Sequence, residues 1–171
     1  MFMKKDPEIE LLSQKLGFSR TLFLEKDLML IDGKNKKELF ISLPQQKLAL
    51  YHPPTEELLR LALEKTNINI IYGLENVHPK DSPHFVRGGL DQVLCAIAAK
   101  NNKIIGFSFS DIINSKNQSQ TLARMKFNVK LCQKYKVKTL FSTFASHRWE
   151  LRSAKDLETL WRVLGGKKQK N

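Results

Sequence analysis

The stretch at residues 85–113 joins a helical pattern of apolar positions to a strand pattern. Its first half repeats apolar residues at the i, i+3, i+4, i+7 spacing of an amphipathic helix. Asn101 and Asn102 then favour a left-handed helix stop, and Ile104–Phe107 is a short apolar run of the kind buried in parallel sheets. A helix followed so closely by a strand predicts half of a βαβ unit. The helical stripe consists of Leu90, Val93, Leu94 and Ile97.

The same alternation continues on both sides of this stretch. Cap residues mark the helix starts, such as Asp6 before Pro7 and Ser153 three residues before Asp156, and Gly17 and Gly165 mark helix ends. We therefore expect strands and helices to alternate along most of the chain. The expected strands are 1–5, 21–24, 69–72 and 137–141, and the expected helices are 7–16, 55–65, 120–135 and 153–164.

Residues 28–51 fit two different structures. The runs LMLI, ELFISL and KLALY are all strand-like, and the gap between the last two is too short for a crossover helix of about a dozen residues. The pattern leaves open whether a hairpin lies here or whether ELFISL is part of a degenerate helix.

The alternation predicts an α/β fold with a mostly parallel sheet of about six or seven strands and flanking helices. Periodicity does not decide whether such a sheet closes into a barrel or stays open. A chain of 171 residues is long enough for one core, so we expect a single domain over residues 1–166. The basic residues 167–171 are expected to form a disordered tail.

The positive charge is concentrated in the last third of the chain. The net charge is +12, yet residues 1–113 carry 15 Lys/Arg against 14 Asp/Glu, whereas residues 114–171 carry 14 against 3. This segregation indicates a polyanionic partner, and a solvated surface kept for solubility is the alternative. No apolar run approaches the roughly 18 residues of a membrane span and the N-terminus is no secretory signal, so we expect a cytoplasmic protein with no membrane partner. Cys95 and Cys132 are then expected to be reduced core thiols.

Motifs of catalytic chemistry are missing from the sequence. The four histidines form no HxH or HExxH pattern, and the loop with His78, Asp81 and His84 matches no known set of metal ligands. There is no GxSxG, and we read Ser110 or Asp111 as a helix cap rather than as part of a nucleophile site. We therefore expect no catalytic residues, no metal ligands and no cofactor in the protein.

Arg87, Gly88 and Gly89 lie where a strand should end and a helix should begin, which is where ligands bind in α/β folds. The two glycines could present backbone N–H groups to an anion while Arg87 pairs with it as a fork. The alternative is that the glycines only allow the loop to pack closely.

A row of lysines follows one face of the helix expected at 120–135. Lys126, Lys130 and Lys134 are spaced by four residues between two packed flanks. Like charges at this spacing destabilise an isolated helix by a few tenths of a kcal/mol each, which bound phosphates would relieve. A simple solvated face is the alternative.

Further arginines sit near expected strand ends or helix starts, and one of them precedes an aromatic residue. Guanidinium and indole groups both suit nucleotides, so Arg148 and Trp149 could pair with and stack on one. Trp149 could equally be a half-buried lid over the end of the sheet. The candidate RNA-binding residues are Arg87, Arg124, Lys126, Lys130, Lys134, Arg148 and Arg152.

Three stretches in this order are similar to a known family: FVRGGLDQVLCAIAAKNNKIIGFSFSDII, ARMKFNVKLCQKYKVKTLFSTFAS and ELRSAKDLETLWRVLG. They resemble the TIM-barrel-like protein subunit of archaeal and eukaryotic ribonuclease P, known in archaea as component 3. The resemblance covers residues 68–165, and the first 67 residues fit only loosely. The family's usual Arg-Ser-Gly stands here as Arg87-Gly88-Gly89.

The resemblance implies a noncatalytic subunit of a particle that removes the 5′ leader of precursor tRNA. Catalysis and Mg²⁺ then belong to the ribonuclease P RNA, and the protein partner is a small ferredoxin-like subunit of the same particle. Precursor tRNA is an indirect partner. It also implies a TIM-barrel-like fold, and we expect an incomplete barrel whose free strand edge a partner could cover. The competing hypotheses are a metal-dependent phosphoesterase of barrel type and a general RNA-binding accessory protein.

Overall fold

The computed structural model describes residues 2–40, 44 and 46–167, which form alternating strands and helices. The strands are β1 (Leu28–Ile31), β2 (Leu48–Tyr51), β3 (Ile70–Tyr72), β4 (Ile104–Ser108) and β5 (Lys138–Ser142). The helices are α1 (Pro7–Lys15), α2 (Glu56–Lys65), α3 (Gln92–Lys100), α4 (Phe109–Asn114), α5 (Gln118–Lys134) and α6 (Ala154–Val163). Short 3-10 helices are η1 (Lys37–Leu39), η2 (Leu74–Asn76) and η3 (Arg148–Glu150).

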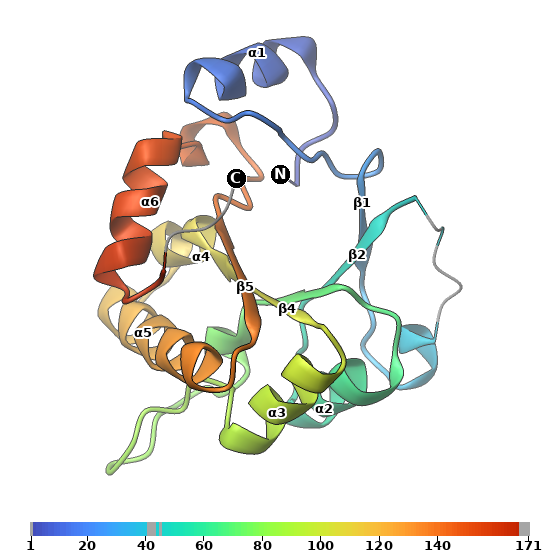
Figure 1. Cartoon of the computed structure of the whole chain (residues 1–171), viewed down its shortest axis with the longest axis vertical. Coiled ribbons are helices and arrows are strands. Elements are labelled where there is room, and N and C mark those ends of the chain that lie inside the picture. Colours follow the sequence, from blue (N-terminus) through green and yellow to red (C-terminus); the bar gives the residue numbers. More distant parts are fainter. Residues whose placement is uncertain (1, 41–43, 45, 168–171) are drawn as a thin grey trace.

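The five strands form one open, fully parallel sheet in the order β1-β2-β3-β4-β5. Figure 1 shows α2, α3, α5 and α6 outside this sheet, with α1 at the top between α6 and β1. The predicted α/β class and incomplete barrel are confirmed. The expected number of about seven strands was too high for the described residues, where five strands pair in the sheet.

The difference in strand number arises at the beginning of the chain. Residues 21–24, expected as a strand, contribute only an isolated bridge at Leu24, and the described part of 1–5 forms no strand. Instead, the backbone N–H of Phe2 donates to Ala145 O at 2.9 Å, and the N–H of Leu24 donates to Met3 O. The first residues therefore lie beyond the carboxyl end of β5 and beside Leu24, without a strand ladder.

Both faces of the sheet bury apolar side chains, which is usual for a parallel sheet. One set of alternate residues, including Tyr51, Ile71 and Phe107, packs against the helices in the main core. The other set forms a smaller core on the concave side, where the rings of Tyr72 and Phe144 stack at 5.2 Å. The smaller core consists of Leu28, Leu50, Ile70, Tyr72 and Phe144.

Residues 28–51 contain a parallel crossover. β1 and β2 pair in parallel register from Leu28↔Leu48 to Ile31↔Tyr51, so the hairpin alternative is wrong. The connection contains η1, a short helical turn that ends at buried Leu39, and this fits the degenerate helix. Residues 41–43 of ELFISL lie outside the described residues.

The predicted helix signals are largely confirmed. Asp6 and Ser153 cap α1 and α6 through side-chain acceptance from backbone N–H groups, and Asn102 and Gly165 adopt positive φ after their helices. The apolar stripe of α3 was partly misassigned. The helix begins after its cap Asp91, and Val93 is 50% exposed while Leu94, Cys95 and Ala98 are buried.

Two further predictions concern the thiols and the chain end. Cys95 and Cys132 are free and buried, as expected for core thiols. No helix among the described residues is long and apolar enough to span a membrane. Most of the expected tail, residues 168–171, lies outside the described residues.

Candidate nucleic-acid interface

Helix α5 carries a row of exposed lysines. Its 17 residues contain no Asp or Glu, while Met125, Val129 and Cys132 bury the opposite face. We name Lys126, Lys130 and Lys134, which are all exposed, the lysine ridge. Within the described residues none of the three forms an ion pair, although the ammonium of Lys134 lies 5.5 Å from the centroid of the Tyr135 ring.

The ridge is followed in the chain by two more exposed lysines that sequence reasoning left out. Lys136 has φ 56 in the turn after α5, and Lys138 is the first residue of β5. Both are exposed. Their signal was the alternation in KVK, where only Val137 is buried and the lysines on either side point to solvent. The uncompensated positive charge therefore extends from α5 to the start of β5.

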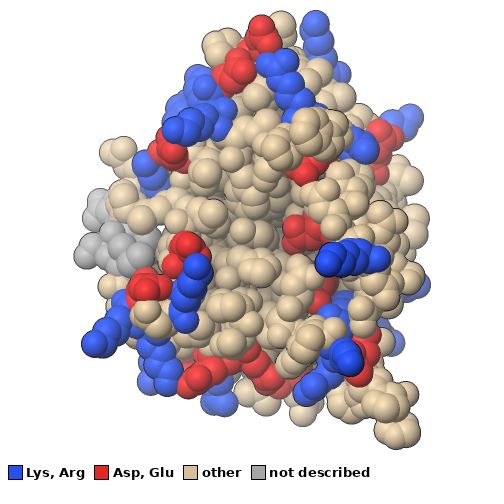
Figure 2. All heavy atoms as spheres, turned by 180° about the vertical axis from the view of Figure 1, so that it is seen from behind, with Lys and Arg blue, Asp and Glu red and all other residues tan. Residues whose placement is uncertain are grey.

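Ion pairs occur elsewhere in the protein, where acids lie close to basic residues. Lys4, Lys5 and Lys36, for example, each pair with a glutamate at 3.2 Å or less. Figure 2 shows one face of the molecule with basic and acidic side chains interspersed, mostly around a broad uncharged centre. The lysine ridge differs from these mixed surfaces because α5 contains no acidic residue.

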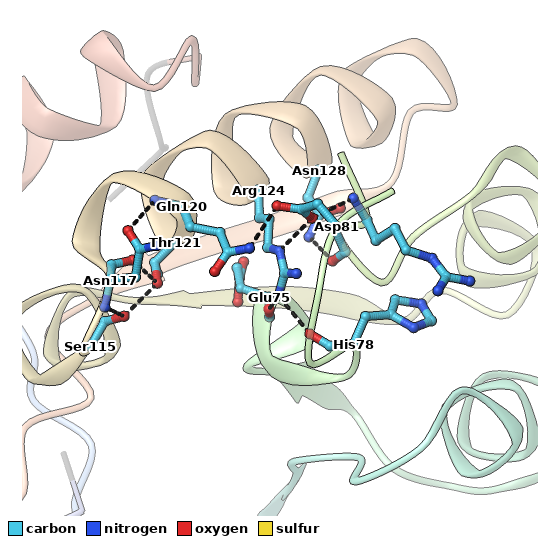
Figure 3. Close-up of polar contacts among 11 residues, drawn as sticks. Glu75, His78, Asp81, Ser115, Asn117, Gln120, Thr121, Arg124 and Asn128 are labelled. Atoms are coloured by element: carbon cyan, nitrogen blue, oxygen red, sulfur yellow. Dashed lines mark hydrogen bonds and ion pairs between the residues drawn. The ribbon is translucent and has the colours of Figure 1, made fainter. Parts of the chain in front are cut away.

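Arg124 does not belong to the exposed surface, although it lies on the same helix. It is 4% exposed, and its Nε donates to Asp81 Oδ1 at 2.9 Å. Its Nη1 donates to the carbonyl oxygens of Glu75 and His78 at 2.6 and 2.7 Å. Figure 3 shows this side chain reaching from α5 to the loop that follows β3. We therefore correct the prediction that Arg124 contacts RNA, because its guanidinium is used to fasten this loop.

Asp81 is the acceptor that gathers the loop and the start of α5. Its carboxylate accepts from the side-chain amide of Gln120, the backbone N–H of Arg87 and the guanidinium of Arg124. These hydrogen bonds lower the pKa of Asp81, with Gln120 contributing most. The network fixes the backbone at Arg87, whose side chain is exposed and has no polar contact with the described residues.

Gly88 and Gly89 are buried, and both are needed for close packing. A Cβ on Gly88 would lie 2.3 Å from Asn128 Oδ1, and one on Gly89 would lie 2.3 Å from Leu74 O. Asn128 Nδ2 also donates to the carbonyl of Gly88 at 2.6 Å. The geometry supports the packing alternative over the anion-binding loop, because the two residues are covered by α5 and η2.

Arg148 and Arg152 also have internal partners. Arg148 Nη2 pairs with Glu8 Oε2 at 2.6 Å and Asp6 Oδ2 at 3.4 Å, so the N-cap residue and one acid in the first turn of α1 already balance its charge. Arg152 Nη1 donates to the carbonyls of Trp149 and Leu151. Of the seven predicted contacts, Arg87 and the lysine ridge are therefore the cations whose side chains have neither a hydrogen bond nor an ion pair among the described residues.

The serines near Asp111 have structural partners. Ser108 caps α4 by accepting from the backbone N–H of Asp111 at 3.1 Å, so the cap is Ser108 rather than Ser110 or Asp111. Ser110 Oγ donates to Thr143 O and to Glu150 Oε2. No group of three His, Cys, Asp or Glu side chains that could hold a metal ion occurs within residues 2–40, 44 and 46–167.

Glu75 is a buried carboxyl in this region that sequence reasoning missed. Its side chain is 1% exposed, and neither carboxyl oxygen has a hydrogen-bond partner among the described residues. Burial raises the pKa of Glu75 from 4.5 to about 8. The carboxyl is therefore protonated in the folded protein at neutral pH, and unfolding releases its proton.

Replacing Glu75 with glutamine should make the protein less sensitive to rising pH. Between pH 4.5 and about 8 the unfolded state ionises Glu75 and the folded state does not, so native stability falls as pH rises. In this range Glu75 lowers the free energy of unfolding by up to about 1.4 kcal/mol for each pH unit, which is the free-energy equivalent of one pKa unit. Urea unfolding across this range should show a flatter profile for Glu75→Gln, whereas exposed Glu57→Gln should follow the wild type. Parallel profiles for all three proteins would refute the assignment.

Comparisons with known proteins find similarity to curated proteins over part of this chain. No protein-family model matches the chain. Ribonuclease P protein component 3 of Thermococcus kodakarensis is 36% identical over 83 residues, which are 46% of this chain and 38% of that protein. The protein of the same name from Methanosarcina acetivorans is 29% identical over 119 residues, or 68% of this chain and 46% of that protein. Over these segments the chain is similar to ribonuclease P protein component 3.

A solved structure shares the fold of this chain. It is a chain in the cryo-EM structure of archaeal ribonuclease P with mature tRNA, with a TM-score of 0.67 and 18% sequence identity. The match covers 97% of this chain and 72% of that chain. The chain spans less than half the length of the two curated component 3 proteins.

Proposed function

We propose that the chain is a noncatalytic protein subunit of ribonuclease P that binds and supports the catalytic RNA. This RNA removes the 5′ leader of precursor tRNA, and the Mg²⁺ needed for cleavage belongs to it. The lysine ridge carries the proposal, because three exposed cations on an acid-free helix suit a run of phosphates. The similarity to ribonuclease P protein component 3 supports the same partner.

Phosphate contacts of this kind position an RNA without reading its bases. Arg87 adds a bidentate donor on a backbone that Asp81 holds in place. The other partners in this proposal are the small ferredoxin-like subunit of the particle and, indirectly, precursor tRNA. The site of action is the cytoplasm.

Purification of the tagged chain from the cells that make it tests this proposal. We expect one discrete RNA with ribonuclease P activity to accompany the protein. A broad mixture of RNAs would instead indicate a general RNA-binding accessory protein. Turnover of a generic phosphodiester by the isolated protein with divalent metal would contradict the noncatalytic role and favour a barrel phosphoesterase.

A further inference from the structure

The loop between β5 and α6 presents a tryptophan to solvent. Trp149 is 69% exposed, so the alternative of a half-buried lid is wrong. Its indole stacks on the imidazole of His147 with ring centroids 4.3 Å apart and planes 8° apart. One face of the indole is thus covered by a parallel ring, and the exposed remainder is a flat aromatic surface. We call His147 and Trp149 the aromatic platform.

The platform is held in place by a buried carboxylate. Glu150 is 2% exposed and accepts from the backbone N–H groups of Ser146 and His147 at 2.6 and 3.2 Å. Asn114 Nδ2 and Ser110 Oγ donate to the same carboxylate at 2.7 and 3.2 Å, which ties the loop to α4. Although burial opposes ionisation, the pKa of Glu150 is lowered by these donors, so the anchor stays charged at neutral pH.

The other side of the platform is fastened by Arg152. Its Nη1 donates to the carbonyls of Trp149 and Leu151 at 2.8 and 2.7 Å, and its guanidinium carbon lies 5.1 Å from the Phe109 ring centroid. Leu151 is buried. The backbone on both sides of Trp149 is therefore fixed before any ligand arrives, which reduces the entropy lost on binding.

We infer that the aromatic platform binds an unpaired nucleobase of the RNA by stacking on Trp149, which rests on the proposed function. The platform lies after the carboxyl end of β5, where parallel α/β folds bind ligands. A parallel ring stack with an exposed end suits another flat ring, and a base must be unpaired to reach it. Arg148 is already paired with Asp6 and Glu8, and the guanidinium of Arg152 donates to backbone carbonyls, so stacking rather than phosphate attraction supplies the binding energy.

Binding of fluorescent oligouridylate of about 12 nucleotides separates stacking from electrostatics. Stacking on a tryptophan is worth enough that Trp149→Ala should weaken binding roughly 5- to 100-fold, while Trp149→Phe keeps most of the affinity. The slope of log affinity against log salt should stay unchanged, because no phosphate contact is removed. A paired RNA duplex of the same length should bind both proteins equally. Phe40→Ala, which removes another exposed aromatic ring, is the matched control.

Tryptophan fluorescence gives a second measurement of binding. If Trp149 had only a structural role, RNA would not change its emission. The chain has two tryptophans, and Trp161 is only 3% exposed, so long-wavelength emission reports Trp149. Oligouridylate should quench this emission in the wild type and not in Trp149→Phe.

The outcomes separate the inference from the proposed function. Unchanged oligouridylate binding by Trp149→Ala, with binding still lost when the lysine ridge is neutralised, overturns the platform and leaves the proposed function standing. Equal losses of affinity for single-stranded and paired RNA in Trp149→Ala also overturn it. Failure of the wild-type protein to bind any RNA contradicts the proposed function itself.

Discussion

Replacing Arg124 with alanine should lower the free energy of unfolding by about 2–4 kcal/mol. Breaking a buried ion pair typically costs 3–5 kcal/mol, and the lower figure allows for Asp81, whose side chain is 27% exposed. In the variant, Asp81 loses its positively charged partner, and the backbone carbonyls of Glu75 and His78 lose their hydrogen-bond donor. Urea unfolding measures the loss, and hydrogen exchange should show that the loop after β3 becomes less protected.

A control on another helix separates this role from the loss of a surface charge. Arg162 is 61% exposed and pairs with Glu158 one turn away, so Arg162→Ala should cost less than about 1 kcal/mol. Arg124→Lys should recover little, because a single ammonium cannot reproduce the planar arrangement that reaches Asp81 and two carbonyls. A similar loss for Arg124→Ala and Arg162→Ala would show that Arg124 is not a structural residue.

Changing Lys126, Lys130 and Lys134 together to glutamine should weaken RNA binding about 100-fold at about 0.1 M salt. Each exposed lysine that contacts a phosphate releases counterions, and none of the three is offset by an acid within the described residues. The variant should fold normally. Removal of like charges spaced by four residues relieves repulsion of a few tenths of a kcal/mol each. Filter binding and thermal unfolding measure the two effects.

The matched control changes the same net charge at another place. Lys4, Lys36 and Lys65 are exposed and lie outside α5. Their triple glutamine variant should retain most of the affinity, since only the average field of the protein changes. Equal weakening by the two variants would mean that total charge, rather than the lysine ridge, attracts the RNA.

Local signals predicted the helices and the core strands well. Caps such as Asp6, Thr55 and Ser153 act on backbone groups within a few residues, so their effect is readable without tertiary structure. The strand runs before Leu28 were different. Whether these runs join the sheet depends on which part of the folded chain they contact. Here the backbone N–H of Phe2 donates to the carbonyl of Ala145, which lies after the last strand. Sequence periodicity carries no information on such a non-local choice.

In the candidate site, too, local features could be predicted from the sequence and features that depend on tertiary contacts could not. The exposed lysine ridge followed from helical spacing alone, whereas the burial of Arg124 depends on the loop that folds over it. A signal existed, because Arg124 and Asn128 are one turn apart on the side of α5 that also carries buried Met125 and Val129. Glu75 and Glu150 gave no such signal. Each is an isolated acid in a polar loop, and only tertiary packing buries it.

The salt dependence of binding to ribonuclease P RNA tests the central claim most directly. The slope of log affinity against log salt should be steep for the wild type, and smaller by about 2–3 for the variant that lacks the three ridge lysines. The control with Lys4, Lys36 and Lys65 changed should keep the wild-type slope. An identical slope for the wild type and the ridge variant would contradict the claim that these lysines bind phosphates.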